Sequence, residues 1–210
     1  DDLTSPNAVD ALAITVSDAV SAAQGATIVG ATTGTVTFTT GISDEFANLI
    51  TGNLATPTTT VSAKDADINV AISTAVTITT AAHKTQLNAI SAATSGNVSG
   101  SVTGDVTHLA GLTADANNVL NITLNDTTDP TVSTLADICN ATVGTIKYAG
   151  GNDFSLLYSN LIGAGFDPQD YQDINARTFV NPDSAVVITI TSSGSTNPSG
   201  KTKIDTALGA

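Results

Sequence analysis

The sequence is poor in the residues from which disulfides, bulky cores and many active sites are built. Among 210 residues there is no Met and no Trp, aromatic residues make up 4%, and Cys139 is the only cysteine. A single cysteine excludes a disulfide within the chain, and its apolar neighbours favour a packed side chain over a reactive thiol. The scarcity of oxidisable side chains is compatible with a position outside the cell.

Long apolar runs and positive charge are also scarce. No stretch of the sequence approaches the roughly 18 apolar residues of a membrane-spanning helix, so we expect no membrane insertion. The chain carries 6 Lys and Arg residues against 19 Asp and Glu residues, a formal net charge of −13, and Glu45 is the only glutamate. A surface this negative repels nucleic acid and anionic membranes, so we expect neither as a partner, whereas it attracts divalent cations.

The motifs of common enzymes are missing as well. The sequence has no Gly-x-Ser-x-Gly elbow, no Gly-x-x-x-x-Gly-Lys-Ser/Thr loop and no Gly-x-Gly-x-x-Gly. Neither His83 nor His108 has a second His or Cys at the spacing of metal ligands. We therefore expect no enzymatic activity. A carbohydrate-active enzyme is the minor alternative, and it would need Asp65, Asp105 and Asp126 on one sheet face.

What the sequence does contain is a degenerate repeat built around Ala-Thr-x-Gly. The pattern ends at Gly34, Gly96 and Gly144, which are separated by 62 and 48 residues. Each copy predicts a strand, a short helix, a turn at the glycine, a second strand and another short helix. In these repeat turns we expect the glycine to end the helix in the left-handed conformation.

Strand–helix alternation defines the expected fold class, which is α/β. It predicts a solenoid-like stack of strands and short helices with a largely parallel sheet, joined by right-handed crossovers. An ordinary doubly wound domain is the alternative. Strand centres are expected near residues 15, 37, 60, 77, 99, 122, 146 and 188. The repeat region is assigned to residues 1–150, with copies near 14–75, 76–125 and 126–165.

Residues 151–210 depart from the repeat and are interpreted as a β-containing unit that caps the stack or docks onto a neighbour. Their apolar strand provides the predicted assembly residues, which are Val186, Val187, Ile188 and Ile190. An apolar strand near a terminus can complete the sheet of another subunit, so copies of the chain itself are the expected partner, in a head-to-tail homopolymer.

Calcium is the ligand that the sequence suits best. Asp167, Asp170 and Asp173 follow one another at three-residue steps in a polar segment, and oxygen-rich loops suit Ca²⁺. Turn and capping roles are the alternative, because Asp favours both. The Gly-Gly-x-Gly-x-Asp nonapeptide of calcium-binding β-rolls is absent.

Alternating threonines, as in TVTFT (residues 35–39), place hydroxyl groups on one face of the predicted strands. Such a face is either a solvated surface or a binding surface for sugar or ice. The pattern Ala-Thr-Thr-Gly-x-Val-x-Phe followed by ISDEFANLI resembles the Thr/Ala-rich repeats of very large secreted bacterial proteins. These repeats occur in marine bacteria and cyanobacteria, in surface-layer-like, adhesin and haemolysin-type calcium-binding proteins. The resemblance covers roughly residues 10–165.

The resemblance implies a spacer or scaffold module. We therefore expect an extracellular structural protein at the cell surface, a subunit or segment of a self-assembling surface layer, sheath or filament. The alternatives are an adhesin that binds cell-surface polysaccharide, an ice-binding module and a phage fibre segment.

Overall fold

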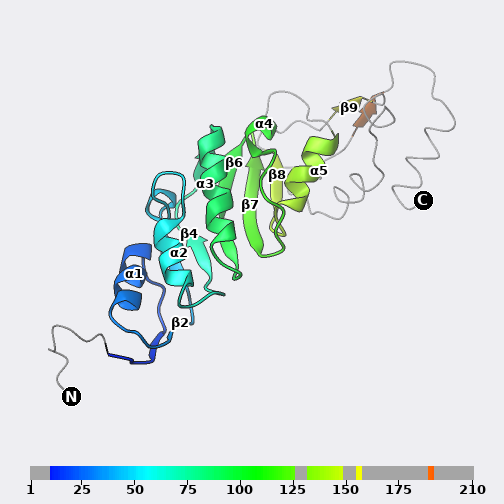
Figure 1. The fold of residues 1–210 in the computed structure, drawn as a ribbon. Coiled ribbons are helices and arrows are strands. Elements are labelled where there is room, and N and C mark those ends of the chain that lie inside the picture. Colours follow the sequence, from blue (N-terminus) through cyan, green and yellow to red (C-terminus); the bar gives the residue numbers. More distant parts are fainter. Residues whose placement is uncertain (1–9, 126–131, 149–154, 158–188, 192–210) are drawn as a thin grey trace, which may run out of the picture. The chain divides into compact units, whose positions relative to one another are not determined.

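The computed structural model describes residues 10–125, 132–148, 155–157 and 189–191 (Figure 1). The chain is α/β, its strands are mostly parallel, and no sheet of the described residues closes into a barrel. It divides into two compact units, Asp1–Val76 with Thr85–Ser101, and Thr77–Lys84 with Val102–Ala210. The predicted boundary at residue 150 lies outside the described residues.

The first unit contains two groups of parallel strands. β1 pairs with β2, β3 pairs with β4, and β4 also pairs with the first residues of β6. β6 contributes Val98–Ser101 to this unit and Val102–Gly104 to the other. The elements up to β6 are β1 (Ile14–Val16), α1 (Ala22–Gly30), β2 (Val36–Phe38), β3 (Ile42–Asp44), η1 (Phe46–Asn48), α2 (Thr56–Ser62), β4 (Val70–Ile72), β5 (Val76–Ile78), α3 (Ala81–Ala92) and β6 (Val98–Gly104).

In the second unit β7 and β8 are parallel, with Ile122 opposite Ile146, and α5 connects them. A further parallel pair is formed by β9 and β10. The described elements that follow β6 are α4 (Val106–Leu109), β7 (Asn118–Leu124), α5 (Val132–Asn140), β8 (Ile146–Tyr148), β9 (Ser155–Leu157) and β10 (Thr189–Thr191).

The core consists of small and medium aliphatic side chains, as the composition predicts. Its largest fully buried members are Ile42, Leu49, Ile68, Ile78, Leu87, Ile90, Leu109, Leu120, Ile122, Leu124 and Leu135. The alternation predicted for β2 is confirmed, because Val36 and Phe38 are buried and Thr37 is exposed. Helices α1 and α2 have 9 and 7 residues, too few for a stable isolated helix, so packing against this core stabilises them.

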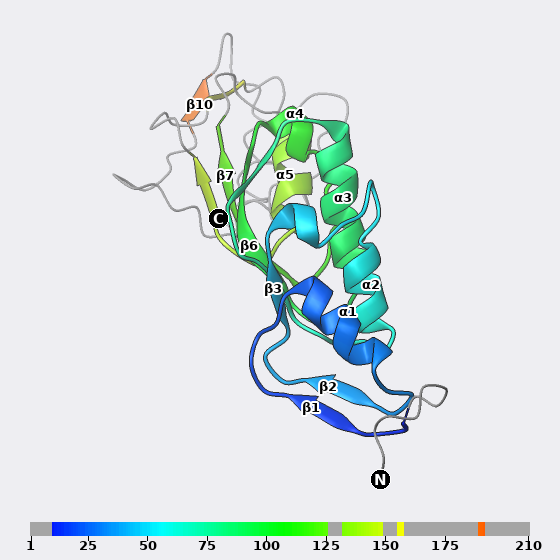
Figure 2. The same cartoon turned by 90° about the vertical axis from the view of Figure 1, so that its left-hand side faces the viewer.

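Helix α1 lies beside α2 (Figure 2). The approach depends on Gly25, since a Cβ there would lie 2.9 Å from a methyl group of Val61 in α2. A capping box starts α1: the Ser21 hydroxyl accepts from the Gln24 N–H at 3.2 Å, and the Gln24 side chain accepts from the Ser21 N–H at 2.9 Å.

Two secondary-structure predictions are wrong. The strand expected near residue 60 is helix α2, whose first turn contains Pro57 with its fixed φ, and whose buried Thr58 and Val61 share one face. The segment expected to form the next short helix begins instead as β3, because Ile42 is buried and pairs with Val70 of β4. Strands β3 and β4 were not predicted.

Candidate functional site

The repeat turns form the same hydrogen-bonded structure three times, and we call each of these structures a junction. In the third junction Thr142 is fully buried, and its Oγ1 lies 3.0 Å from the carbonyl oxygen of Asn118 and 2.9 Å from that of Leu120. The same Oγ1 accepts the N–H of Gly144 at 2.9 Å. The N–H of Val143 donates to the Asn118 carbonyl at 2.8 Å. The turn is thereby held against the beginning of β7.

The second junction repeats these contacts around Thr94, which is 8% exposed. Its Oγ1 donates to the carbonyl oxygens of Ala66 at 3.2 Å and Ile68 at 2.6 Å, and it accepts the N–H of Gly96 at 2.9 Å. The N–H of Ser95 donates to the Ala66 carbonyl at 2.9 Å. The turn therefore leads into β6 in parallel register with β4.

The first junction has the same arrangement around Thr32, which is 3% exposed. Thr32 Oγ1 donates to the carbonyl oxygens of Asp10 at 2.8 Å and Leu12 at 2.7 Å and accepts the N–H of Gly34 at 2.9 Å. The N–H of Thr33 donates to the Asp10 carbonyl at 3.1 Å. In all three junctions the residue two places after the glycine pairs with the strand that contains or directly follows the carbonyl residues.

The glycines serve a different purpose from the one expected. None of the three has a positive φ, so the predicted left-handed helix ending is wrong. Each glycine lies against a carbonyl oxygen of the neighbouring strand start: Leu12 for Gly34, Asp67 and Ile68 for Gly96, and Leu120 for Gly144. A Cβ would overlap these oxygens, so the junction needs glycine because two backbones approach closely.

Two junctions carry an additional asparagine that the repeat pattern did not reveal. The side-chain oxygen of Asn69 accepts the N–H of Asn97 at 3.0 Å. That of Asn121 accepts both the N–H of Thr145 at 3.3 Å and its hydroxyl at 2.7 Å. Ala13 holds the equivalent place in the first junction. The sequence does contain a signal for these contacts. Asn69 and Asn121 each lie three residues after the first residue that supplies a carbonyl to the junction, Ala66 and Asn118.

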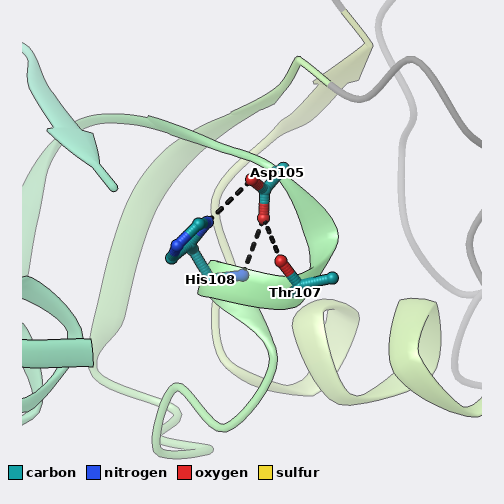
Figure 3. A network of polar contacts seen from close by, with 3 residues as sticks. All are labelled: Asp105, Thr107 and His108. Carbon is teal, nitrogen blue, oxygen red and sulfur yellow. Dashed lines mark hydrogen bonds and ion pairs between the residues drawn. The ribbon is translucent and has the colours of Figure 1, made fainter. Parts of the chain in front are cut away.

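A separate polar cluster lies at the start of α4 (Figure 3). Asp105 caps this short helix: its Oδ1 accepts the Thr107 hydroxyl at 2.6 Å and the His108 N–H at 2.8 Å, and its Oδ2 lies 2.7 Å from His108 Nδ1. The hydrogen bond from the Thr107 hydroxyl is the largest cause that lowers the pKa of Asp105, to about 2. The His108 contacts also lower it, and burial opposes them. The Asp105 and His108 side chains are each just over one-third exposed, and all their contacts are local. The cluster is a helix cap.

This cap makes stability depend on pH in a defined direction. A depressed folded-state pKa stabilises the protein above the ordinary value of 3.8, and this contribution is lost as the pH falls toward about 2. We expect Asp105→Ala to reduce the free energy of unfolding by about 1 kcal/mol near neutral pH and by much less near pH 2. Urea unfolding of Asp105→Ala and wild type at both pH values measures this. An unchanged difference would contradict the assignment.

Most of the acidic residues singled out as ligand or catalytic candidates cannot be placed in the fold. Asp167, Asp170, Asp173 and Asp126 lie outside the described residues. Among the residues that the structure describes, no group of three or more His, Cys, Asp or Glu side chains could share a metal ion. Burial and the nearby Asp67 raise the pKa of Asp65, although its carboxylate accepts the Phe38 N–H at 2.6 Å. This hydrogen bond connects the loop that contains Asp65 to the end of β2.

The predicted threonine face is present only over part of the first unit. Thr15 and Thr37 are neighbours in the β1–β2 register and both are exposed. In the β3–β4–β6 register the corresponding row is Ser43, Ala71 and Ser99, all partly buried. The outward face of these strands is therefore a mixed polar surface and not a regular array of threonine hydroxyls.

A shallow groove runs beside α2 and the end of α3. It is lined by Leu54, Ala55, Thr56, Thr59, Thr60, Ala63, Ala89, Ala92 and Ala93. None of these side chains titrates, so the groove itself offers no acid, base or ionised ligand.

The predicted assembly strand is described only in part. Ile190 lies in β10, which pairs in parallel with β9, Thr189 lying opposite Ser155. Val186, Val187 and Ile188 lie outside the described residues. One edge of the described part of this strand is thus used within the chain.

No protein-family model matches the chain, and no curated protein or solved structure shows significant similarity to it. In the described part of the chain, no helix combines the length and apolar character needed to cross a bilayer.

Proposed function

We propose that the chain is an extracellular structural protein, a subunit or segment of a self-assembling surface layer, sheath or filament. In this proposal the strands and short helices form a solenoid-like stack, with residues 151–210 as a capping or docking unit. The single observation that supports it is the threefold use of one junction, which each time holds a strand beside an earlier, parallel strand.

The chemistry of the junction favours a structural role over ligand binding. Its threonine hydroxyl is buried, and its hydrogen-bonding capacity is used by backbone groups of the same chain. A binding site keeps polar groups available for a ligand, whereas a junction uses them to fix the register of two strands. Repeating such a unit gives a rigid body in which each coil contacts its neighbours, and open ends permit head-to-tail growth.

An adhesin is the alternative that the exposed polar strand face supports. Thr15 and Thr37, together with the mixed row beside them, offer hydroxyl groups that could contact a polysaccharide. A glycan array separates the two functions, because a scaffold gives no saturable binding to any sugar. Thr15→Val combined with Thr37→Val would abolish such binding if the adhesin interpretation holds.

Electron microscopy of the purified full chain tests the proposal. We expect elongated or layered polymers whose length grows with protein concentration, because a head-to-tail contact does not close. Parallel samples in calcium and in chelator determine whether the ion is required for assembly. A monodisperse monomer at every concentration, with and without calcium, would overturn the proposed function.

A further inference from the structure

Among the residues that the structure describes, strand β1 is paired along one edge and unpaired along the other. The Ile14 N–H donates to the Thr35 carbonyl at 2.9 Å, and the Val16 carbonyl accepts the Thr39 N–H at 2.9 Å. Because backbone groups alternate in direction along a strand, the N–H and C=O of Thr15 point away from β2. No strand of the described residues pairs with that edge.

The apolar residues around β1 are also less covered than their equivalents. Leu12, Ile68 and Leu120 each supply the second carbonyl to a junction threonine. Ile68 and Leu120 are 1% exposed, whereas Leu12 is 50% exposed. The same position is thus buried in the second and third junctions and half exposed in the first.

Strand β4 shows what completes such a strand in this protein. It occupies the same place in the second junction as β1 does in the first, and it has β3 on one edge and β6 on the other. Its Val70 is fully buried, whereas the equivalent Ile14 is only partly buried. Among the described strands, β1 therefore differs from β4 in having no second neighbour.

We propose that the open edge of β1, residues 12–16, binds a strand of a second copy of this chain, which extends the sheet as β3 does at β4. The inference rests on the proposed function and names one of its contacts. A strand fits because main-chain donors and acceptors are what the edge offers. A copy fits because residues 11–17, which lie between Asp10 and Asp18, carry no charge, so the paired stretch itself places no like charges opposite each other in two chains of net charge −13.

The test compares two exposed leucines of the first unit. Leu12→Glu places a charge at the proposed contact, whereas Leu54→Glu adds the same charge at a side chain that is 67% exposed beside the α2 groove. We expect Leu12→Glu to raise the concentration needed for half-maximal assembly at least about tenfold, and Leu54→Glu to leave it unchanged. Sedimentation velocity of the full chain at a series of concentrations measures the concentration of half-maximal assembly.

A second variant tests the same contact in case Leu12→Glu does not fold. Thr15→Pro removes the N–H that points away from β2 and leaves the β1–β2 hydrogen bonds in place, so we expect a folded chain that does not assemble. Circular dichroism confirms the fold of each variant. Assembly of Leu12→Glu and Thr15→Pro at the wild-type concentration would overturn the β1 contact while the proposed function stands.

The other outcomes also separate the two proposals. A wild-type dimer that Leu12→Glu dissociates supports the β1 contact but contradicts a polymer. Equal loss of assembly in Leu54→Glu means that added charge alone acts, which overturns the β1 assignment. A wild-type monomer at all concentrations overturns both.

Discussion

Replacing Gly96 with Ala is expected to lower the free energy of unfolding by about 3 kcal/mol, a fall in Tm of about 6–12 °C for a chain of this size. The added Cβ would overlap the carbonyl oxygens of Asp67 and Ile68, which belong to the backbone and cannot rotate away. Relief therefore requires the turn to separate from the start of β4. Urea unfolding followed by circular dichroism measures the loss.

Gly30 provides the matched control for this substitution. It ends α1 in the same unit, its φ is not positive, and a Cβ there has no atom within 4 Å. Gly30→Ala should leave stability unchanged or raise it by up to about 1 kcal/mol, because Ala favours a helix more than Gly does. Equal stability of the Gly30 and Gly96 variants would show that the junction tolerates a side chain.

Replacing Thr142 with Val should lower the free energy of unfolding by about 2–4 kcal/mol. Valine keeps the shape of the side chain but removes the hydroxyl of the fully buried Thr142, so the Gly144 N–H and the carbonyls of Asn118 and Leu120 lose a partner. A buried polar group left without a hydrogen bond is more costly than a lost methyl group.

Thr142→Ser separates the hydroxyl from the methyl group. Serine can make every hydrogen bond of the junction. The free energy of unfolding should therefore fall only by the roughly 0.8 kcal/mol expected for one buried carbon. The same urea titration compares the two variants. If Val is as stable as Ser at this position, the hydroxyl does not hold the strands together.

The sequence located the junctions but not their mechanism. The spacing of Gly34, Gly96 and Gly144 identified the turns, because repetition is visible without knowledge of contacts. Each threonine, however, bonds carbonyls 20 to 28 residues earlier in the chain. No local pattern contains such partners. The sequence therefore suggests that the junction glycines are needed for a left-handed backbone conformation. The structure shows that they are needed because two backbones approach closely.

Secondary structure was predictable where the apolar pattern was strong. The strand centres expected near residues 15, 37, 77, 99, 122 and 146 all fall within strands. At Thr58–Val61 the high β-propensity of Thr and Val indicated a strand, but Pro57 and burial against neighbouring elements favour a helix. Strand β4 was missed because its sequence VAI lacks the polar middle residue that alternates with apolar neighbours in the equally short β1, β2, β5 and β8.

Hydrogen exchange at the three junction glycines is the most direct measurement of the central claim, that one structure is built three times to hold successive strands together. NMR of the full chain can follow the N–H groups of Gly34, Gly96 and Gly144 one by one. Each is bonded to a buried threonine oxygen, so all three should be strongly protected, and Thr142→Val should remove protection first at Gly144. Exchange at any of the three at the rate of an unstructured peptide would contradict the account.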